Sequence, residues 1–170
     1  RWSTKTHRAF SAVTGSGNVG SSAHGLAWAA GVERLNALMA ESDVVVISAP
    51  LNERTVGIIG AEQLRALGPT GVLINVGRGP LIVESALYEA LSTRIIAGAA
   101  IDVWYKYPDS DGRGAPSELS FAELPNVLMT PHSSGVTSNT FMGRVDDIAA
   151  NIGRLARGAQ LHNLVTDTAS

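Results

Sequence analysis

Four short apolar runs recur along the middle of the chain and predict buried β-strands. They cover residues 43–48, 71–76, 95–103 and 126–130, and valine and isoleucine are frequent in them. Continuous apolar runs of this length are typical of strands that are buried on both faces, as in a parallel sheet.

Segments with apolar residues at helical spacing lie between and after these runs. They cover residues 32–41, 61–67, which end before Gly68, and 83–92, and the longest begins after Thr137 and ends near Gly158. Its apolar positions follow one another at steps of four and three: Phe141, Val145, Ile148, Ile152 and Leu155. Alternating strands and helices predict an α/β fold with a doubly wound parallel sheet.

Two stretches lack both patterns and predict loops. Residues 105–124 contain two prolines, two glycines and several acids, which indicates a long surface loop. Residues 15–20 match G-x-G-x-x-G, the turn that approaches a dinucleotide pyrophosphate. A weak strand at 9–14 precedes them, but residues 21–30 show no clear amphipathic stripe, residues 32–41 are helical, and no second strand ending in an acid fits before Asp43. We interpret 15–20 as a flexible loop, with the dinucleotide turn as the alternative.

Composition narrows the class of protein. The chain has 170 residues, is 45% hydrophobic and 16% charged, and carries a formal net charge of −2. This balance gives no electrostatic reason to expect nucleic acid. The absence of cysteine excludes disulfides and thiol catalysis. No apolar run approaches the length of a membrane span. The apolar, cysteine-free composition suits a cytoplasmic α/β protein.

Polar residues follow the carboxyl ends of the predicted strands. Residues 49–55 follow the first run, Arg78 lies between two glycines after the second, Asp102 ends the third and His132 follows the fourth. Taken singly, each is more often a solvated or structural turn residue. Because open α/β sheets bind ligands at this edge, their recurrence there predicts a functional site.

Four ordered motifs resemble those of the D-isomer-specific 2-hydroxyacid dehydrogenases, to which formate dehydrogenase is related. They lie at residues 41–55, 75–91, 98–104 and 130–135, and the resemblance runs from about Gly25 to Val165. It implies a Rossmann-like cofactor domain that lacks its first strand and most of the substrate domain. It also implies a homodimer. From the composition we expect neither a nucleic-acid nor a membrane partner, and we predict no metal site.

The resemblance implies hydride transfer between NAD or NADP and a small 2-hydroxy or 2-oxo acid. Arg78 would hold the acid's carboxylate and carbonyl. His132 would exchange a proton with the carbonyl oxygen. Asp102 would hydrogen-bond the nicotinamide carboxamide. The cofactor would be lined by Pro50, Thr55, Val76, Gly77, Arg78, Asp102, Ser134 and Gly135.

One position departs from the family pattern. The family usually places a Glu beside the catalytic His, and formate dehydrogenases place a Gln there, whereas this chain has Tyr107 before Pro108. A carboxylate stabilises a neighbouring imidazolium, whereas a tyrosine hydroxyl orients a ring without supplying charge at neutral pH. Either the site is tuned to another substrate or pH range, which we favour because Arg78, Asp102 and His132 remain, or activity is lost.

The resemblance also implies the domain layout. Residues 1–157 would form a partial dinucleotide-binding domain, and 158–170 would return to a mostly absent substrate domain. Residues 25–28 fit the family's third strand and 1–8 the end of its second, which leaves 15–20 in a variable loop. The phosphate-binding turn would then precede Arg1, which stands where a complete chain has Met.

Two consequences follow from that layout. Strand 43–48 would become an unpaired sheet edge, so we expect the 170-residue chain alone to be inactive. Lys5, His7 and Arg8 would lie near the adenosine ribose without an acid to bind its 2′-hydroxyl, which favours NADP weakly. Solvated basic residues at a chain end are an equal alternative.

Two other function classes compete with the enzyme. A degenerate dehydrogenase domain would bind a dinucleotide or serve in assembly without turnover, and Tyr107 supports it. A response-regulator-like or flavodoxin-like module is disfavoured, because it gives no reason for Arg78 and His132 to end neighbouring strands.

Overall fold

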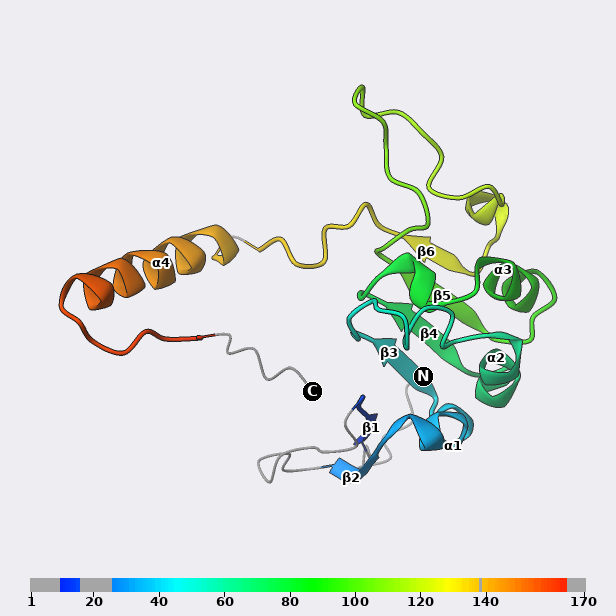
Figure 1. Ribbon diagram of the computed structural model, residues 1–170. Helices are drawn as coiled ribbons and strands as arrows, with labels where there is room; N and C mark the ends of the chain where they lie inside the picture. Colours follow the sequence, from blue (N-terminus) through cyan, green and yellow to red (C-terminus); the bar gives the residue numbers. More distant parts are fainter. Residues whose placement is uncertain (1–9, 16–25, 138, 165–170) are drawn as a thin grey trace. The chain divides into compact units, whose positions relative to one another are not determined.

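Four parallel strands form the sheet that the apolar runs predict. They are β3 (Val44–Ile47), β4 (Val72–Asn75), β5 (Gly98–Ile101) and β6 (Val127–Met129), and they lie side by side in that order (Figure 1). The computed structural model describes residues 10–15, 26–137 and 139–164. The chain divides into two units, residues 1–132 and 133–170, and each is described by itself.

The register of the sheet aligns the carboxyl ends of all four strands. Ile47 pairs with Asn75, Asn75 with Ile101, and Ile101 with Met129. The loops that follow the strands therefore leave the sheet at one edge. β5 is shorter than the run predicted over 95–103: it begins at Gly98 and ends at Ile101.

Three helices cover one face of this sheet. They are α1 (Leu35–Glu41), preceded by a 3₁₀ turn η1 (Val32–Arg34), α2 (Ala61–Leu67) and α3 (Glu84–Ser92). Their apolar residues form one core with alternate residues of the strands: Met39, Leu64, Leu67, Leu87 and Leu91 with Val45, Ile47, Leu73, Ala99 and Ile101. Gly68, in a left-handed conformation (φ 77°), ends α2 as predicted.

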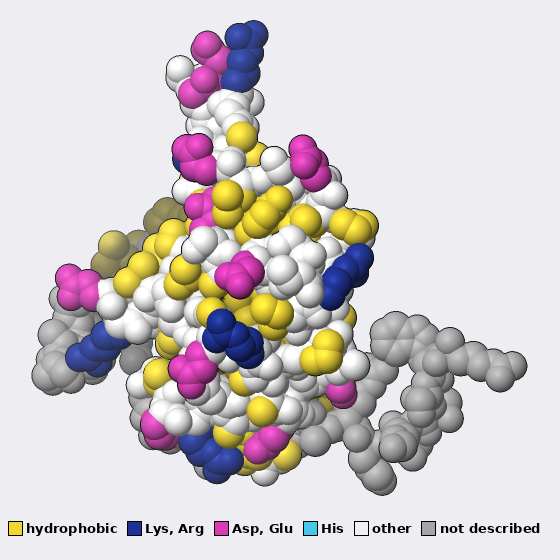
Figure 2. All heavy atoms as spheres, turned by 90° about the vertical axis from the view of Figure 1, so that its right-hand side faces the viewer, with side chains coloured by type: hydrophobic (Ala, Val, Ile, Leu, Met, Phe, Trp, Pro, Cys, Tyr) yellow, Lys and Arg dark blue, Asp and Glu magenta, His cyan; other side chains and the backbone are white. Residues whose placement is uncertain are grey.

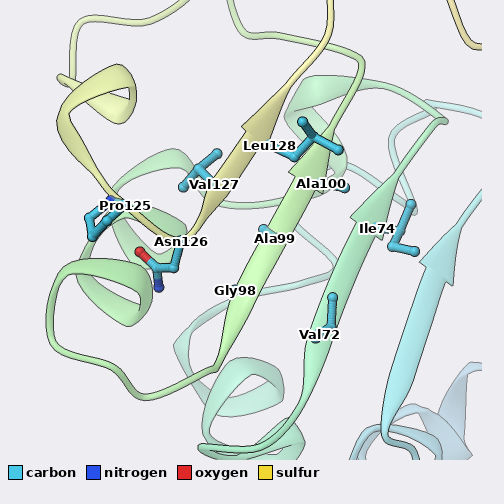
Figure 3. Close-up of a pocket in the computed structure, with 9 residues that line it drawn as sticks. All are labelled: Val72, Ile74, Gly98, Ala99, Ala100, Pro125, Asn126, Val127 and Leu128. Carbon is cyan, nitrogen blue, oxygen red and sulfur yellow. The ribbon is translucent and has the colours of Figure 1, made fainter. Parts of the chain in front are cut away.

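The opposite face of the sheet is open, so the prediction of burial on both faces is wrong for these strands. Val44, Val46 and Leu128 are 52%, 58% and 64% exposed. Val72 and Ile74 lie on the same face and line an open apolar hollow of about 390 Å³ across β4, β5 and β6 (Figure 3). The exposed valines of β3 lie on the face of the sheet that α1, α2 and α3 do not cover.

The predicted surface loop at 105–124 is partly wrong. Its first part does project from the body of the unit, and acidic and basic side chains crowd its tip (Figure 2). Its end forms a short 3₁₀ turn, η3 (Phe121–Glu123), and Phe121 is only 1% exposed. The Phe121 ring packs against Tyr88, Trp104 and Tyr105, with ring centroids 5.3 to 6.4 Å apart. An aromatic cluster thus anchors this loop in the core.

A separate parallel pair precedes α1. β1 (Phe10–Val13) pairs with β2 (Leu26–Ala30), in agreement with the weak strand at 9–14 and with the strand expected near 25–28. Residues 16–20 of the glycine motif lie outside the described residues, as do Lys5, His7 and Arg8.

The second unit contains the longest helix, α4 (Thr140–Ala156). Gly158 follows it with a φ of 63°, and its N–H donates to the Leu155 carbonyl at 3.0 Å, which closes the helix where the sequence predicts. The predicted apolar stripe of α4 is exposed, from Val145 at 57% to Leu155 at 69%. In the part of the chain that the structure describes, no helix is long and apolar enough to cross a membrane.

The two faces of the sheet make a matched pair of stability tests. Leu73 is fully buried, whereas Leu128 is 64% exposed on the open face. We expect Leu73→Ala to lower the free energy of unfolding by about 2–5 kcal/mol, because it leaves a cavity. Leu128→Ala should cost less than about 1 kcal/mol. Urea denaturation measures both values, and equal losses would contradict the description of the two faces.

Candidate active site

The predicted site residues of the first unit lie along the carboxyl edge of the sheet. Arg78 follows β4, Asp102 follows β5 and His132 follows β6. The aligned register puts the three strand ends in one row. β5 lies between β4 and β6. Arg78 and His132 therefore belong to two separate loops at the same edge of the sheet.

The turn that carries Arg78 is shaped by the buried side chain of Asn75. This side chain is 1% exposed, donates from Nδ2 to the Arg78 carbonyl at 3.0 Å and accepts the Gly77 N–H at Oδ1, also at 3.0 Å. A Cβ on Gly79 would lie 2.4 Å from the Trp104 carbonyl oxygen. The turn is therefore held from within by an amide and from outside by the backbone that follows β5.

Arg78 itself is exposed at this edge. Its guanidinium donates to the Gly77 carbonyl at 2.6 Å, which directs the side chain back along its own turn. A guanidinium has five N–H donors in a planar fork that matches a carboxylate. The position suits the binding of an anionic ligand beside β4.

Tyr107 and His132 are brought together although 25 positions separate them. The Tyr107 hydroxyl lies 3.3 Å from His132 Nδ1, and the ring centroids are 5.8 Å apart. His132 follows Pro131 and adopts a left-handed conformation (φ 57°), which costs a residue with a Cβ about 1–3 kcal/mol. The turn thus departs sharply from β6 at the residue that carries the imidazole.

A hydrogen-bonded bridge joins the ends of β5 and β6 just before His132. The Trp104 indole N–H donates to the Thr130 carbonyl at 3.1 Å, and the Thr130 hydroxyl donates to Asp102 Oδ1 at 2.5 Å. Asp102 is 3% exposed and Trp104 7%. The Trp104 backbone also lies against Gly79. Trp104 therefore contacts the Arg78 loop through its backbone and the strand end before His132 through its indole.

Sequence reasoning gave no role to Asn75, Trp104 or Thr130, although all three stand within the quoted motifs. A polar or indole side chain at the last residues of an apolar strand, directly before a candidate site residue, is the signal that marks them. Their partners are backbone groups of other loops, which no spacing rule specifies.

The residues expected to line a cofactor fall into two groups. Pro50 and Thr55 belong to the turn after β3, where the Thr55 hydroxyl donates to the Pro50 carbonyl at 2.7 Å. A Cβ on Gly77 would come within 3.0 Å of the Ala49 carbonyl oxygen, so the turns after β3 and β4 approach closely. Ser134 and Gly135 belong to the second unit, where Gly135 accepts a hydrogen bond from the Thr140 hydroxyl at 3.1 Å.

The loop that carries Tyr107 is tied to α3 through Glu84. The Ser117 hydroxyl donates to Glu84 Oε1 at 2.6 Å, and Ser117 is buried. Burial, and then the Glu84 carboxylate, raise the pKa of the nearby Tyr105 hydroxyl well above its ordinary value of 10.0. At the exposed side of the loop, a hydrogen bond from Lys106 lowers the pKa of the Glu118 carboxyl.

Within the described ranges, no cluster of three His, Asp or Glu side chains is arranged to hold a metal ion.

Comparison with known proteins identifies the family. Residues 12–134 match the family model described as the NAD binding domain of D-isomer specific 2-hydroxyacid dehydrogenase. The chain belongs to this family. The match covers the parallel sheet and its carboxyl-edge loops, so it confirms both the resemblance and the Rossmann-like fold.

Similar proteins agree with this assignment. The chain is 39% identical to glyoxylate/hydroxypyruvate reductase B of Enterobacter agglomerans over 118 residues, 69% of this chain and 35% of that protein. It is 36% identical to glyoxylate reductase of Korarchaeum cryptofilum over 131 residues, 77% of this chain and 38% of that protein. The chain therefore spans little more than a third of the length of either relative.

Solved structures of the family superpose on most of the chain. A D-isomer specific 2-hydroxyacid dehydrogenase from Xanthobacter autotrophicus Py2, in complex with NADPH and MES, matches with a TM-score of 0.74 and 30% identity. This match covers 92% of this chain and 60% of that one. D-lactate dehydrogenase with NAD+ from Lactobacillus jensenii gives 0.77 and 26% over 93% of this chain and 48% of that one.

The raised pKa of Tyr105 predicts a loss of stability in alkali. The neutral hydroxyl is favoured in the folded state, so its contribution is complete below the ordinary pKa of 10.0 and is lost as pH rises above that value. We expect the thermal midpoint to fall as the pH rises from about 10 to about 11, and to fall less in Tyr105→Phe. Identical slopes for the two proteins would contradict this assignment.

Proposed function

We propose that the protein to which this chain belongs is an NAD(P)-dependent oxidoreductase. It transfers a hydride between a nicotinamide cofactor and a small 2-hydroxy or 2-oxo acid. The observation that carries the proposal is the Tyr107–His132 pair after β6, at the same edge of the sheet as Arg78, in a member of this dehydrogenase family.

Arg78 binds the acid. Its exposed guanidinium forms charge-assisted hydrogen bonds with the substrate carboxylate and carbonyl oxygen, which orients the carbonyl carbon. The Asn75 amide keeps the turn in place, because its two hydrogen bonds fix the Gly77 N–H and the Arg78 carbonyl.

His132 moves the proton. Its Nδ1 faces the Tyr107 hydroxyl, so Nε2 is the ring atom that gives a proton to the carbonyl oxygen in reduction and takes it from the hydroxyl in oxidation. The Tyr107 hydroxyl fixes the ring orientation without adding a charge. A reduced nicotinamide held at this edge would supply the hydride for the carbonyl carbon, so that the product would be the 2-hydroxy acid.

The carboxyl edge suits a nicotinamide dinucleotide. The close approach of the turns after β3 and β4, at Gly77, leaves no room for a side chain and brings backbone groups to the edge. The residues that would hold the cofactor are Pro50, Thr55, Val76, Gly77, Arg78, Asp102, Ser134 and Gly135. Both NAD and NADP stay candidates, since related structures were solved with NADPH and with NAD+.

The same proposal includes the layout of the whole protein. Residues 1–157 belong to the dinucleotide-binding domain, and 158–170 lead toward a substrate domain. We propose a homodimer in the cytoplasm, with a small acid as its partner and no role for nucleic acid. Gel filtration of the intact gene product measures the oligomeric state, and a stable monomer would contradict the dimer.

One observation favours a second function, a dinucleotide-binding or assembly module without turnover. Tyr107 stands where the family resemblance expects a carboxylate, so His132 lacks a charged partner at this position. Binding of NADH or NADPH without reduction of any 2-oxo acid would support the module.

Turnover by the intact gene product tests the enzyme. We expect oxidation of NADH or NADPH with a panel of 2-oxo acids, followed by absorbance, and a fall in kcat of about 10²–10⁴ in His132→Ala because the proton donor is lost. His162→Ala, in the exposed segment after α4, is the matched control and should retain activity. No turnover between about pH 5 and about pH 8 would overturn the proposal.

Substitution of Tyr107 tests whether its hydroxyl contributes to the reaction, as expected for a tuned site and not for a degenerate one. In Tyr107→Phe the ring remains and the hydroxyl that faces His132 is lost, so we expect kcat to fall about tenfold with little change in KM. Tyr88→Phe, on α3 with its ring packed against Phe121, removes the same hydroxyl group from another tyrosine and is the control. An unchanged kcat in Tyr107→Phe would show that the hydroxyl has no part in the reaction.

A further inference from the structure

The segment that carries Tyr107 returns to the body of the unit beside α3. It leaves the sheet after β5, projects from the body and ends in η3, where the ring centroids of Phe121 and Tyr88 on α3 are 5.3 Å apart (Figure 1). The two limbs of this projection meet at its base, where the Lys106 N–H donates to the Pro116 carbonyl at 3.0 Å. Tyr107 directly follows this bridge, so the position of its ring depends on how the base is held.

A buried hydrogen bond ties this base to α3. The Ser117 hydroxyl donates to Glu84 Oε1 at 2.6 Å, and Ser117 is 6% exposed. The same hydroxyl accepts the Leu119 N–H at 2.8 Å, so it also shapes the chain that leads into η3. A hydrogen bond to a carboxylate is stronger than one between neutral groups. The base is therefore held to α3 at the residue next to Pro116, which bonds the limb that carries Tyr107.

Glu84 also belongs to the segment that continues from Arg78. A short 3₁₀ turn, η2 (Gly79–Leu81), follows Arg78 and leads into α3, of which Glu84 is the first residue. A second contact joins the same two segments, because a Cβ on the first residue of η2 would lie 2.4 Å from the Trp104 carbonyl oxygen. The loop of Tyr107 thus meets the segment after Arg78 at two places, one before Tyr107 and one after it.

We propose that Glu84 and Ser117 are positioning residues for the proton transfer. Their hydrogen bond holds the base of the projection, which keeps the Tyr107 hydroxyl 3.3 Å from His132 Nδ1 and so maintains the orientation of the imidazole. Neither residue needs to touch substrate or cofactor, because both act through Tyr107. This inference rests on the proposed function and adds two residues, distant in sequence from His132, to the groups on which its proton transfer depends.

Steady-state kinetics of the intact gene product distinguishes this role from a general loss of structure. In Glu84→Ala we expect kcat for a 2-oxo acid to fall about threefold to tenfold, because Tyr107 is no longer held against His132. KM for the acid should change less than about twofold, since the Asn75 amide holds the Arg78 turn by separate hydrogen bonds. A rise in KM with an unchanged kcat would overturn the proposal.

Three matched variants control this measurement. Glu84→Gln keeps a side-chain oxygen that accepts the Ser117 hydroxyl, and it should retain at least about half of the original kcat. Glu89→Ala removes an exposed carboxylate from the same helix and should leave kcat unchanged. Ser117→Ala breaks the same bond from the other side and should reproduce the fall in kcat. Thermal midpoints report on folding, and if Glu84→Ala does not fold, Ser117→Ala takes its place in every comparison.

A double variant tests whether Glu84 acts through Tyr107. Once Tyr107→Phe has removed the hydroxyl, the group that Glu84 positions is gone, so adding Glu84→Ala should lower kcat by less than about 1.5-fold more. A merely structural role would give losses that multiply, because the two substitutions would then act independently. Multiplied losses would overturn the proposal and leave the oxidoreductase intact.

The His132 ring gives a readout that needs no turnover. Its NMR signals, assigned by their loss in His132→Ala, should shift in Glu84→Ala and in Ser117→Ala toward those of Tyr107→Phe, and should stay unchanged in Glu89→Ala. Signals that move only in Tyr107→Phe would overturn the positioning role. If no 2-oxo acid is reduced, the proposed function fails and the role in proton transfer fails with it, whatever these signals show of the pair.

Discussion

In-register parallel pairing of β3, β4, β5 and β6 is the constraint on which the rest of the structure depends. Pairing of Ile47, Asn75, Ile101 and Met129 across the sheet makes the four strands end together. Each following loop then leaves the sheet at the same edge, and polar residues far apart in the chain become neighbours there. A shift of one residue in any strand would exchange its buried and exposed faces.

At the carboxyl edge of the sheet, a few side chains hold the loops of the candidate site in place by hydrogen bonds to backbone groups. The Asn75 amide shapes the Arg78 turn, and the Trp104 indole holds the strand end before His132. Gly79 allows the Arg78 turn to lie against the backbone of Trp104, because any Cβ there would collide with the Trp104 carbonyl. Rigid backbone around exposed Arg78 and His132 is what positions them, as expected when functional groups stand on loops of a fixed scaffold.

Two features of the structure differ from what the sequence motifs predict: the exposed face of the sheet and the Tyr107–His132 pair. Val46 and Leu128 are exposed although their strands are continuously apolar, because α1, α2 and α3 of the same unit pack against the other side of the sheet. At the site, a neutral hydroxyl faces His132. Such a partner orients an imidazole by a hydrogen bond but does not stabilise its charged form as a carboxylate would.

The sequence by itself determined the strands, the helices, the parallel α/β class and the positions of Arg78, Asp102 and His132 at strand ends. These depend on local periodicity and on motif order, both of which are written along the chain. Tertiary structure decided which face stays open, that Phe121 is core rather than surface, and that Tyr107 meets His132 across 25 positions. It also decided the roles of Asn75 and Trp104, since their partners are backbone groups brought close only by the register of the sheet.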